Sequence, residues 1–176
     1  MKERLMQFLI RNNIGYMVPR NFGLVFWNRF HQYVLGINIK AKCPVHFTSR
    51  IDGYRNIIMP KQRNSIVTSF VVSGGCYFTI FPGTTLEIGE GTIWSYNVCI
   101  QTGDHDAVDR SIHHKGNIKL GKNCWIAANV TITKGVELGD NVTVGANSVV
   151  TKSFPSNVVI GGVPAKIIRQ LEIPGK

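Results

Sequence analysis

Three of the five histidines stand in one polar stretch, residues 103–117, which reads GDHDAVDRSIHHKGN. The histidines are His105, His113 and His114, and the same stretch holds Asp104, Asp106 and Asp109. Histidine is the first candidate for a general base, because its ordinary pKa lies near neutrality. Such a base needs its second ring nitrogen held, and a nearby carboxylate or a backbone carbonyl could serve. Adjacent residues of an extended chain point to opposite sides, so Asp104 and Asp106 can both turn away from the imidazole of His105.

The segment that must position these side chains carries a six-residue repeat. In LGKNCWIAANVTITKGVELGDNVTVGANSVV, residues 120–150, an aliphatic residue recurs at every sixth position: Leu120, Ile126, Ile132, Leu138, Val144 and Val150. The same register upstream contains Ile88, Trp94 and Ile100. Three residues after each of these positions from Ile88 to Val144 stands Gly or Asn, which tolerate positive φ: Gly91, Asn97, Gly103, Asn123, Asn129, Gly135, Asn141 and Asn147. The repeat predicts short strands that each end in a corner, with the aliphatic residue pointing inward.

Three such strands close one triangular coil, and coils stack through parallel hydrogen bonds. Residues 88–105, 120–137 and 138–155 are each expected to form a coil. The register is interrupted between Ile100 and Leu120, so a loop must leave the coil within residues 103–117. Upstream, the stretch MPKQRNSIVTSF, residues 59–70, also breaks the spacing.

The repeat, together with four motifs, makes residues 86–169 resemble the hexapeptide-repeat acyltransferases. The motifs are NVCIQTGDHD, NCWIAANVTI, VGANSVVTK and GGVPAKIIR. Within the family, the chain is most similar to the maltose and galactoside O-acetyltransferases and to the sugar O-acetyltransferases of surface-polysaccharide clusters. The resemblance implies a left-handed parallel β-helix, a homotrimer with grooves between neighbouring prisms, and acetyl transfer from acetyl-CoA to a sugar hydroxyl. Gly75 and Gly83 stand where the maltose and galactoside enzymes carry polar acceptor-binding residues, which argues against a free disaccharide and favours a surface-polysaccharide precursor.

The resemblance also assigns roles to particular residues. His105 matches the position of the catalytic histidine, with Asp104 and Asp106 as candidates to orient it. Trp125 matches a Trp that packs beside the site, although a structural Trp at a corner is an equal alternative. The positions that line the acyl-CoA groove are Ala128, Ala146, Thr151, Lys152, Lys166 and Arg169.

The C-terminal motif VPAKIIRQL predicts a short helix after Pro164. Lys166 and Arg169 would then share one helical face, where two cations beside Lys152 would suit the phosphates of CoA. A solvated helix face is the alternative interpretation.

The N-terminal segment holds most of the excess charge. The whole chain has a net charge of +10, and residues 1–63 contain eleven Lys/Arg but two Asp/Glu. The stretch NFGLVFWNRFHQYVL places Phe22, Phe26, Phe30 and Tyr33 or Val34 along one side of a helix. Such a face could cover the open end of the first coil, or it could contact an anionic membrane together with the cations. We expect no nucleic-acid partner.

The sequence thus predicts an all-β protein, a left-handed parallel β-helix over 36–163 with an out-looped segment near 104–117. A helical segment over 1–35 precedes it, and a helix and tail over 164–176 follow. No apolar run approaches the ~18 residues that span a bilayer, and no secretory signal is present. We therefore expect a cytoplasmic protein, with peripheral contact at the inner membrane face as an option.

Other chemistries are less compatible with the sequence. The four cysteines form no Cys-x-x-Cys pair, which favours reduced, buried thiols. No histidine lies between Lys115 and Lys176, so we expect no metal site of the γ-carbonic-anhydrase type. Two alternatives to O-acetyl transfer stay open: N-acetyl transfer to an amino-sugar nucleotide, and a catalytically silent β-helix that serves as an assembly module.

Overall fold

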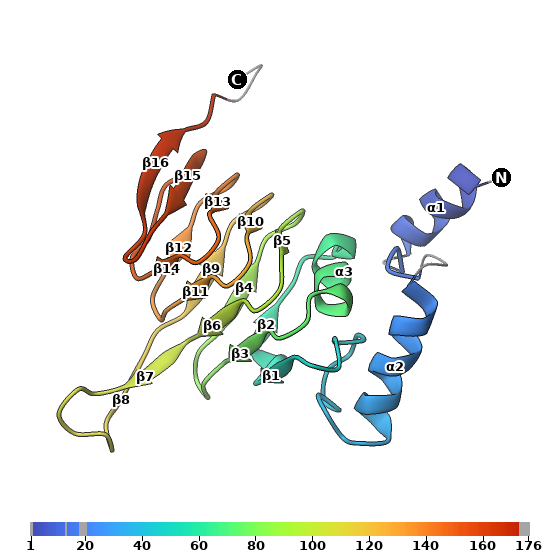
Figure 1. The fold of residues 1–176 in the computed structure, drawn as a ribbon, viewed down its shortest axis with the longest axis horizontal. Coiled ribbons are helices and arrows are strands. Elements are labelled where there is room, and N and C mark those ends of the chain that lie inside the picture. Colours follow the sequence, from blue (N-terminus) through green and yellow to red (C-terminus); the bar gives the residue numbers. More distant parts are fainter. Residues whose placement is uncertain (1, 13, 18–20, 173–176) are drawn as a thin grey trace.

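The computed structural model describes residues 2–12, 14–17 and 21–172, and most of them form a three-walled prism of parallel sheets (Figure 1). Sheet A consists of β1 (Arg50–Asp52), β3 (Tyr77–Thr79), β6 (Cys99–Gln101), β11 (Thr131–Ile132) and β14 (Val149–Val150). Sheet B consists of β2 (Ile57–Ile58), β4 (Leu86–Ile88), β9 (Ile118–Leu120) and β12 (Glu137–Leu138). Sheet C consists of β5 (Ile93–Trp94), β10 (Trp125–Ile126), β13 (Thr143–Val144), β15 (Val158–Gly161) and β16 (Lys166–Gln170).

The six-residue repeat sets the register of these sheets. Leu120 pairs with Ile88 on one side and Leu138 on the other. The repeat positions on the other two walls align in the same way, and all of them are buried in the core of the prism. Seven of the eight predicted corners have positive φ, whereas Gly103 does not, because it begins the strand β7 (Gly103–His105). The asparagine corners also stack, with Asn129 accepting from Asn97 and donating to Asn147, both at 3.0 Å.

The break in the upstream register is a helix that takes the place of a strand. α3 (Asn64–Val72) lies beside β5, where the first strand of sheet C would otherwise stand. The backbone N–H of Trp94 donates to Ser69 Oγ at 3.2 Å, and Ser73 Oγ donates to the Trp94 carbonyl at 2.8 Å. Ile66 and Phe70 are buried on the inner side of α3. The hydroxyls therefore replace some of the strand hydrogen bonds, and the apolar side chains close the coil. The short 3-10 helix η2 (Tyr54–Asn56) precedes β2.

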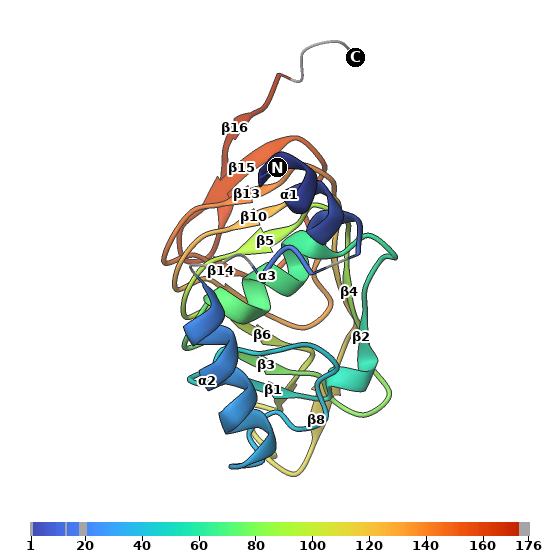
Figure 2. The ribbon, with the colours of Figure 1, turned by 90° about the vertical axis from the view of Figure 1, so that its right-hand side faces the viewer.

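The N-terminal segment is helical, as predicted, but its aromatic stripe faces away from the prism. It forms α1 (Lys2–Arg11) and α2 (Phe22–Tyr33), which lie with α3 along one side of the molecule (Figure 2). Phe26 is 65% exposed, whereas Asn28 and Gln32 are each 1% exposed. The aromatic stripe therefore does not cover the open coil as predicted, because α2 packs against the core through Leu24 and Val25 instead. Within the described ranges, no helix is long and apolar enough to cross a bilayer.

The predicted C-terminal helix is wrong over the described residues. Lys166–Gln170 forms β16, which pairs antiparallel with β15 and extends sheet C. The exposed edge of β15 offers main-chain partners to residues 166–170, and this long-range pairing overrides their weak local helical pattern. Lys166 and Arg169 are exposed, but they no longer lie on one face of a helix.

Candidate active site

The loop predicted within residues 103–117 is a β-hairpin that leaves the prism between β6 of sheet A and β9 of sheet B (Figure 1). Its strands are β7 and β8 (His113–Lys115), which pair antiparallel. Two contacts of β7 help to attach the base of the hairpin to the prism. Asp104 forms an ion pair with Lys134, which lies one coil further along the prism. The backbone of Gly103 passes so close to Phe81 that an added Cβ would lie 3.0 Å from the ring.

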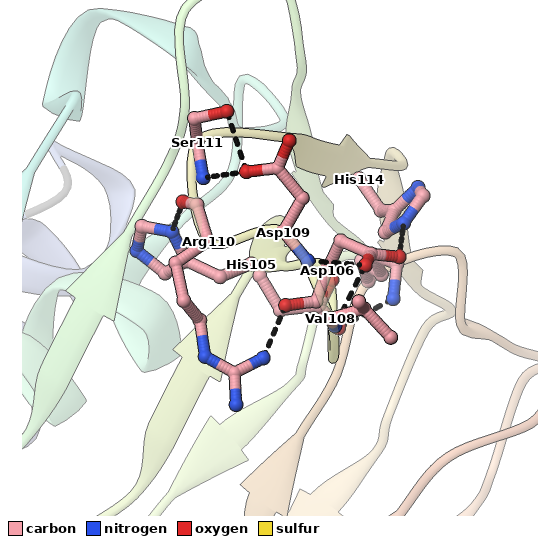
Figure 3. Close-up of polar contacts among 9 residues, drawn as sticks. His105, Asp106, Val108, Asp109, Arg110, Ser111 and His114 are labelled. Carbon is pink, nitrogen blue, oxygen red and sulfur yellow. Dashed lines mark hydrogen bonds and ion pairs between the residues drawn. The ribbon is translucent and has the colours of Figure 1, made fainter.

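The pleat of the hairpin sorts its polar side chains onto two faces. His105 pairs with His113, and their ring centroids lie 4.4 Å apart. Asp104 pairs with His114 on the other face. Asp106 Oδ2 lies 3.0 Å from His114 Nε2, on the side away from the His105 ring (Figure 3). Neither predicted carboxylate therefore contacts His105.

A backbone carbonyl holds His105 instead. Nδ1 of His105 lies 2.7 Å from the carbonyl oxygen of Arg110 (Figure 3). A carbonyl oxygen only accepts, so Nδ1 must carry the hydrogen and Nε2 of the neutral ring keeps its lone pair. The side chain is exposed on the hairpin. The neutral ring of His105 therefore presents Nε2 as a hydrogen-bond acceptor. The partner of Nδ1 gave no sequence signal, because every residue has a carbonyl.

Asp106 acts on this arrangement indirectly, by shaping the turn that presents the carbonyl. Its Oδ1 accepts from the backbone N–H groups of Val108 at 2.8 Å and Asp109 at 3.0 Å. Its own carbonyl accepts from the Arg110 guanidinium. Asp109 Oδ1 in turn accepts from Ser111 N–H at 2.9 Å. The acidic residues near His105 therefore organise the loop rather than the imidazole.

The pKa of the Asp106 carboxyl lies below its ordinary value of 3.8, chiefly because His114 bonds to it and next because the two backbone N–H groups do. A depressed carboxyl pKa stabilises the folded turn above the unfolded pKa of about 3.9, and this stabilisation is lost as the pH falls through the folded pKa.

We predict that His114→Ala raises the Asp106 pKa towards its ordinary value, as measured by NMR titration of the carboxyl carbon. Ser111→Ala is the control, because Ser111 bonds to Asp109. An unchanged Asp106 pKa in His114→Ala would show that this bond does not form in solution.

The other predicted site residues lie on different edges of one chain. Ala128 and Ala146 are stacked at the edge between sheets C and A, where Asn147 N–H donates to the Ala128 carbonyl at 3.0 Å. Trp125 stands on β10 of sheet C, 51% exposed. Thr151 and Lys152 follow β14, at the edge between sheets A and B from which the hairpin leaves at a lower coil. Lys152 Nζ lies 5.7 Å from the centroid of the Phe154 ring. Sheet A therefore separates His105 from the Ala128 and Ala146 edge within a single chain.

The cysteines offer no activated nucleophile. All four are free, and burial raises the pKa of each thiol: Cys43, Cys76, Cys99 and Cys124. Across the part of the chain that the structure describes, no group of three His, Cys, Asp or Glu residues is placed to hold a metal ion.

Comparisons with known proteins agree with this architecture. Residues 117–152 match the family described as bacterial transferase hexapeptide (six repeats). The chain is 38% identical to the galactoside O-acetyltransferase of Escherichia coli K12 over 53% of this chain and 48% of that protein. It is 40% identical to WcaF of the same organism, named as a colanic acid biosynthesis acetyltransferase, over 47% of this chain and 49% of that protein. The chain thus spans about half the length of these curated relatives.

A solved structure extends the similarity beyond the repeat. The crystal structure of a maltose O-acetyltransferase from Clostridium difficile 630 has a TM-score of 0.51 and 31% identity, covering 76% of this chain and 64% of that one. These similarities confirm the resemblance seen in the sequence. The chain carries a bacterial transferase hexapeptide segment over residues 117–152, and the relatives that it matches are named as acetyltransferases of the galactoside, maltose and polysaccharide groups.

Proposed function

We propose that the protein transfers an acetyl group from acetyl-CoA to a sugar hydroxyl, with His105 as the general base. The observation that supports this most is the hydrogen bond from His105 Nδ1 to the Arg110 carbonyl, which leaves Nε2 as an acceptor. The names of the relatives supply the reaction class.

The reaction needs no covalent enzyme intermediate. Nε2 of His105 takes the proton of the acceptor hydroxyl as its oxygen attacks the thioester carbonyl. The tetrahedral intermediate then collapses, the carbon–sulfur bond breaks, and the imidazolium returns the proton to the leaving thiolate. The acetyl ester and free CoA are the products. Direct transfer agrees with the raised thiol pKa values, which leave the cysteines protonated.

We infer that the coil is left-handed, as the hexapeptide repeat implies, and that three copies assemble into a homotrimer. The proposed donor groove contains Ala128, Ala146, Thr151, Lys152, Lys166 and Arg169, with Trp125 packed beside it. Since sheet A separates His105 from the Ala128 and Ala146 edge of its own chain, a groove between copies could join the hairpin of one to this edge of another. This separation within one chain supports an assembly in which the site lies between copies.

For the acceptor, we propose a precursor of a surface polysaccharide. The similarity to WcaF supports this class. Gly75 and Gly83 supply no polar side chain where the maltose and galactoside enzymes bind their acceptors, so a free disaccharide is disfavoured.

The test measures free-thiol release from acetyl-CoA with panels of sugars, glycan precursors and amino-sugar nucleotides. Acceptor-dependent thiol release with hydroxyl acceptors, and an ester in the product, would support the proposal. An amide on an amino-sugar nucleotide would assign the reaction to N-acetyl transfer. If no acceptor raises thiol release above that of acetyl-CoA alone, a silent assembly module is the better description.

We predict that neutralising Lys166 and Arg169 together, as Lys166→Gln/Arg169→Gln, weakens acetyl-CoA binding roughly two- to thirtyfold, because each of the two exposed ion pairs lost contributes about 0.2–1 kcal/mol. The remaining binding should also be less sensitive to salt. Calorimetry with CoA and dephospho-CoA measures both effects. The matched control is Lys119→Gln/Lys122→Gln, which removes two exposed cations elsewhere on the prism. If both double variants bind CoA like the wild type, Lys166 and Arg169 do not contact its phosphates.

A further inference from the structure

Helix α2 is attached to the body of the protein through polar residues. Gln32 Nε2 lies 3.1 Å from the carbonyl oxygens of Asn38, Ala41 and Cys43. Asn28 donates to the Val71 carbonyl at 3.0 Å and accepts from the backbone N–H of Phe47 at 3.0 Å. These bonds fix the rotation of α2 about its axis and therefore determine which side of the helix faces solvent.

The outward side of α2 is apolar and largely aromatic. We call it the aromatic face, and it consists of Phe22, Phe26, Trp27, Phe30, Tyr33 and Val34, which are 37–65% exposed. The ring of Trp27 contacts those of Phe26 and Phe30, with centroids 6.0 and 5.6 Å apart. A continuous apolar surface of this kind is unusual in a protein without a partner.

Cations accompany this face. Arg29 lies over the Tyr33 ring at 5.4 Å and donates to its hydroxyl at 3.0 Å. α1 runs along the same side of the molecule (Figures 1 and 2) and adds the exposed side chains of Phe8, Arg4 and Arg11. Only two acidic residues, Glu3 and Asp52, occur among residues 1–63, against eleven Lys/Arg.

We propose that α1 and the aromatic face of α2 dock the protein on an anionic membrane surface. Trp and Tyr prefer the interface between headgroups and acyl chains, and helices that lie in this plane combine an aromatic face with cations. α2 has twelve residues, which suits a helix lying on a bilayer rather than crossing one. The charge excess selects anionic lipid over a second copy of this chain, because a second copy would bring its own cations to the contact. Docking does not depend on acetyl transfer, although it would bring the prism close to lipid-carried glycans.

The experiment is co-sedimentation of the full chain with vesicles of phosphatidylcholine, alone or mixed with phosphatidylglycerol, at low and high salt. The wild type should bind the phosphatidylglycerol vesicles at low salt and be released at high salt. Phe26→Ser/Trp27→Ser should weaken this binding about tenfold or more. Tyr96→Ser is the control, since Tyr96 is a similarly exposed aromatic at a prism corner. Arg4→Gln/Arg11→Gln should weaken binding about fivefold per cation removed, with the aromatic face intact.

Three results would overturn the proposal: wild-type protein that does not bind phosphatidylglycerol vesicles, equal binding to both vesicle types, or an aromatic variant that binds like the wild type. Thermal unfolding establishes that the variants are folded. Should the aromatic variant fail to fold, the charge variant and the salt dependence decide the question. The remaining outcome is that the wild type does not bind vesicles and Phe26→Ser/Trp27→Ser forms smaller assemblies in sedimentation. That result would show that the aromatic face binds a second copy of the chain. None of these measurements uses acetyl-CoA, so they test membrane docking independently of the proposed acetyl transfer.

Discussion

Replacing His105 with alanine should lower the rate of acetyl transfer by about 10²–10⁴-fold, the usual contribution of a positioned general base. Nε2 of the His105 ring is left to take a proton, because Nδ1 is held by the Arg110 carbonyl. The substitution removes an exposed side chain, so the fold should be nearly unchanged. Acetyl-CoA affinity should also be nearly unchanged, since the base acts on the acceptor hydroxyl. Thiol release under saturating acetyl-CoA measures the rate, and calorimetry measures the affinity.

The control is His31→Ala. His31 lies on α2, and its Nδ1 is bonded within that helix to the Trp27 carbonyl at 2.8 Å. We expect this variant to keep wild-type turnover. If His105→Ala retains more than about a third of the wild-type rate, His105 is not the base that the mechanism requires.

The second large effect concerns Gly121, one of three glycines stacked at the edge between sheets B and C. Each directly follows a repeat position, as Gly89, Gly121 and Gly139 follow Ile88, Leu120 and Leu138. A Cβ on Gly121 would lie 2.4 Å from the carbonyl oxygen of Gly139. The coils cannot separate to relieve this contact, because Gly121 N–H donates to the Leu138 carbonyl at 2.9 Å and fixes their spacing. We therefore predict that Gly121→Ala destabilises the protein by about 3 kcal/mol or more.

Gly145 provides a matched control at the same phase of the repeat, directly after Val144. A Cβ there would meet Ile160 O at 3.5 Å, Ser148 Oγ at 3.9 Å and a Gly161 atom at 4.0 Å, which are ordinary contacts. Gly145→Ala should leave stability unchanged or raise it by about 0.4–1 kcal/mol, because the unfolded chain loses freedom. Urea unfolding of the two variants gives the comparison. Equal midpoints for Gly121→Ala and the wild type would mean that adjacent coils yield more readily than their hydrogen bonds suggest.

The sequence by itself determined the parts of this protein that follow from short-range periodicity. Residues such as Ile126 and Val144 recur at a fixed interval, and each strand of the prism repeats one local conformation, so the sheet register could be read without knowledge of the whole. The asparagine corners were predictable for the same reason, since positive φ restricts residue type locally. The position of the segment that carries His105 was also predictable, because extra residues interrupt the six-residue spacing there.

Only the tertiary structure decided the features that depend on partners distant in the chain. α3 occupies the position of a strand because the hydroxyl of Ser69 accepts from the Trp94 N–H of the neighbouring coil and the hydroxyl of Ser73 donates to the Trp94 carbonyl. β16 is extended because β15 has an open edge. The direction of α2 was set by Asn28 and Gln32, two polar residues whose partners are backbone groups of other segments. The Arg110 carbonyl holds His105 through a loop conformation that leaves no mark in residue types. Backbone groups are common to all residues, so the pairings they make arise from packing in three dimensions and cannot be read from the order of side chains.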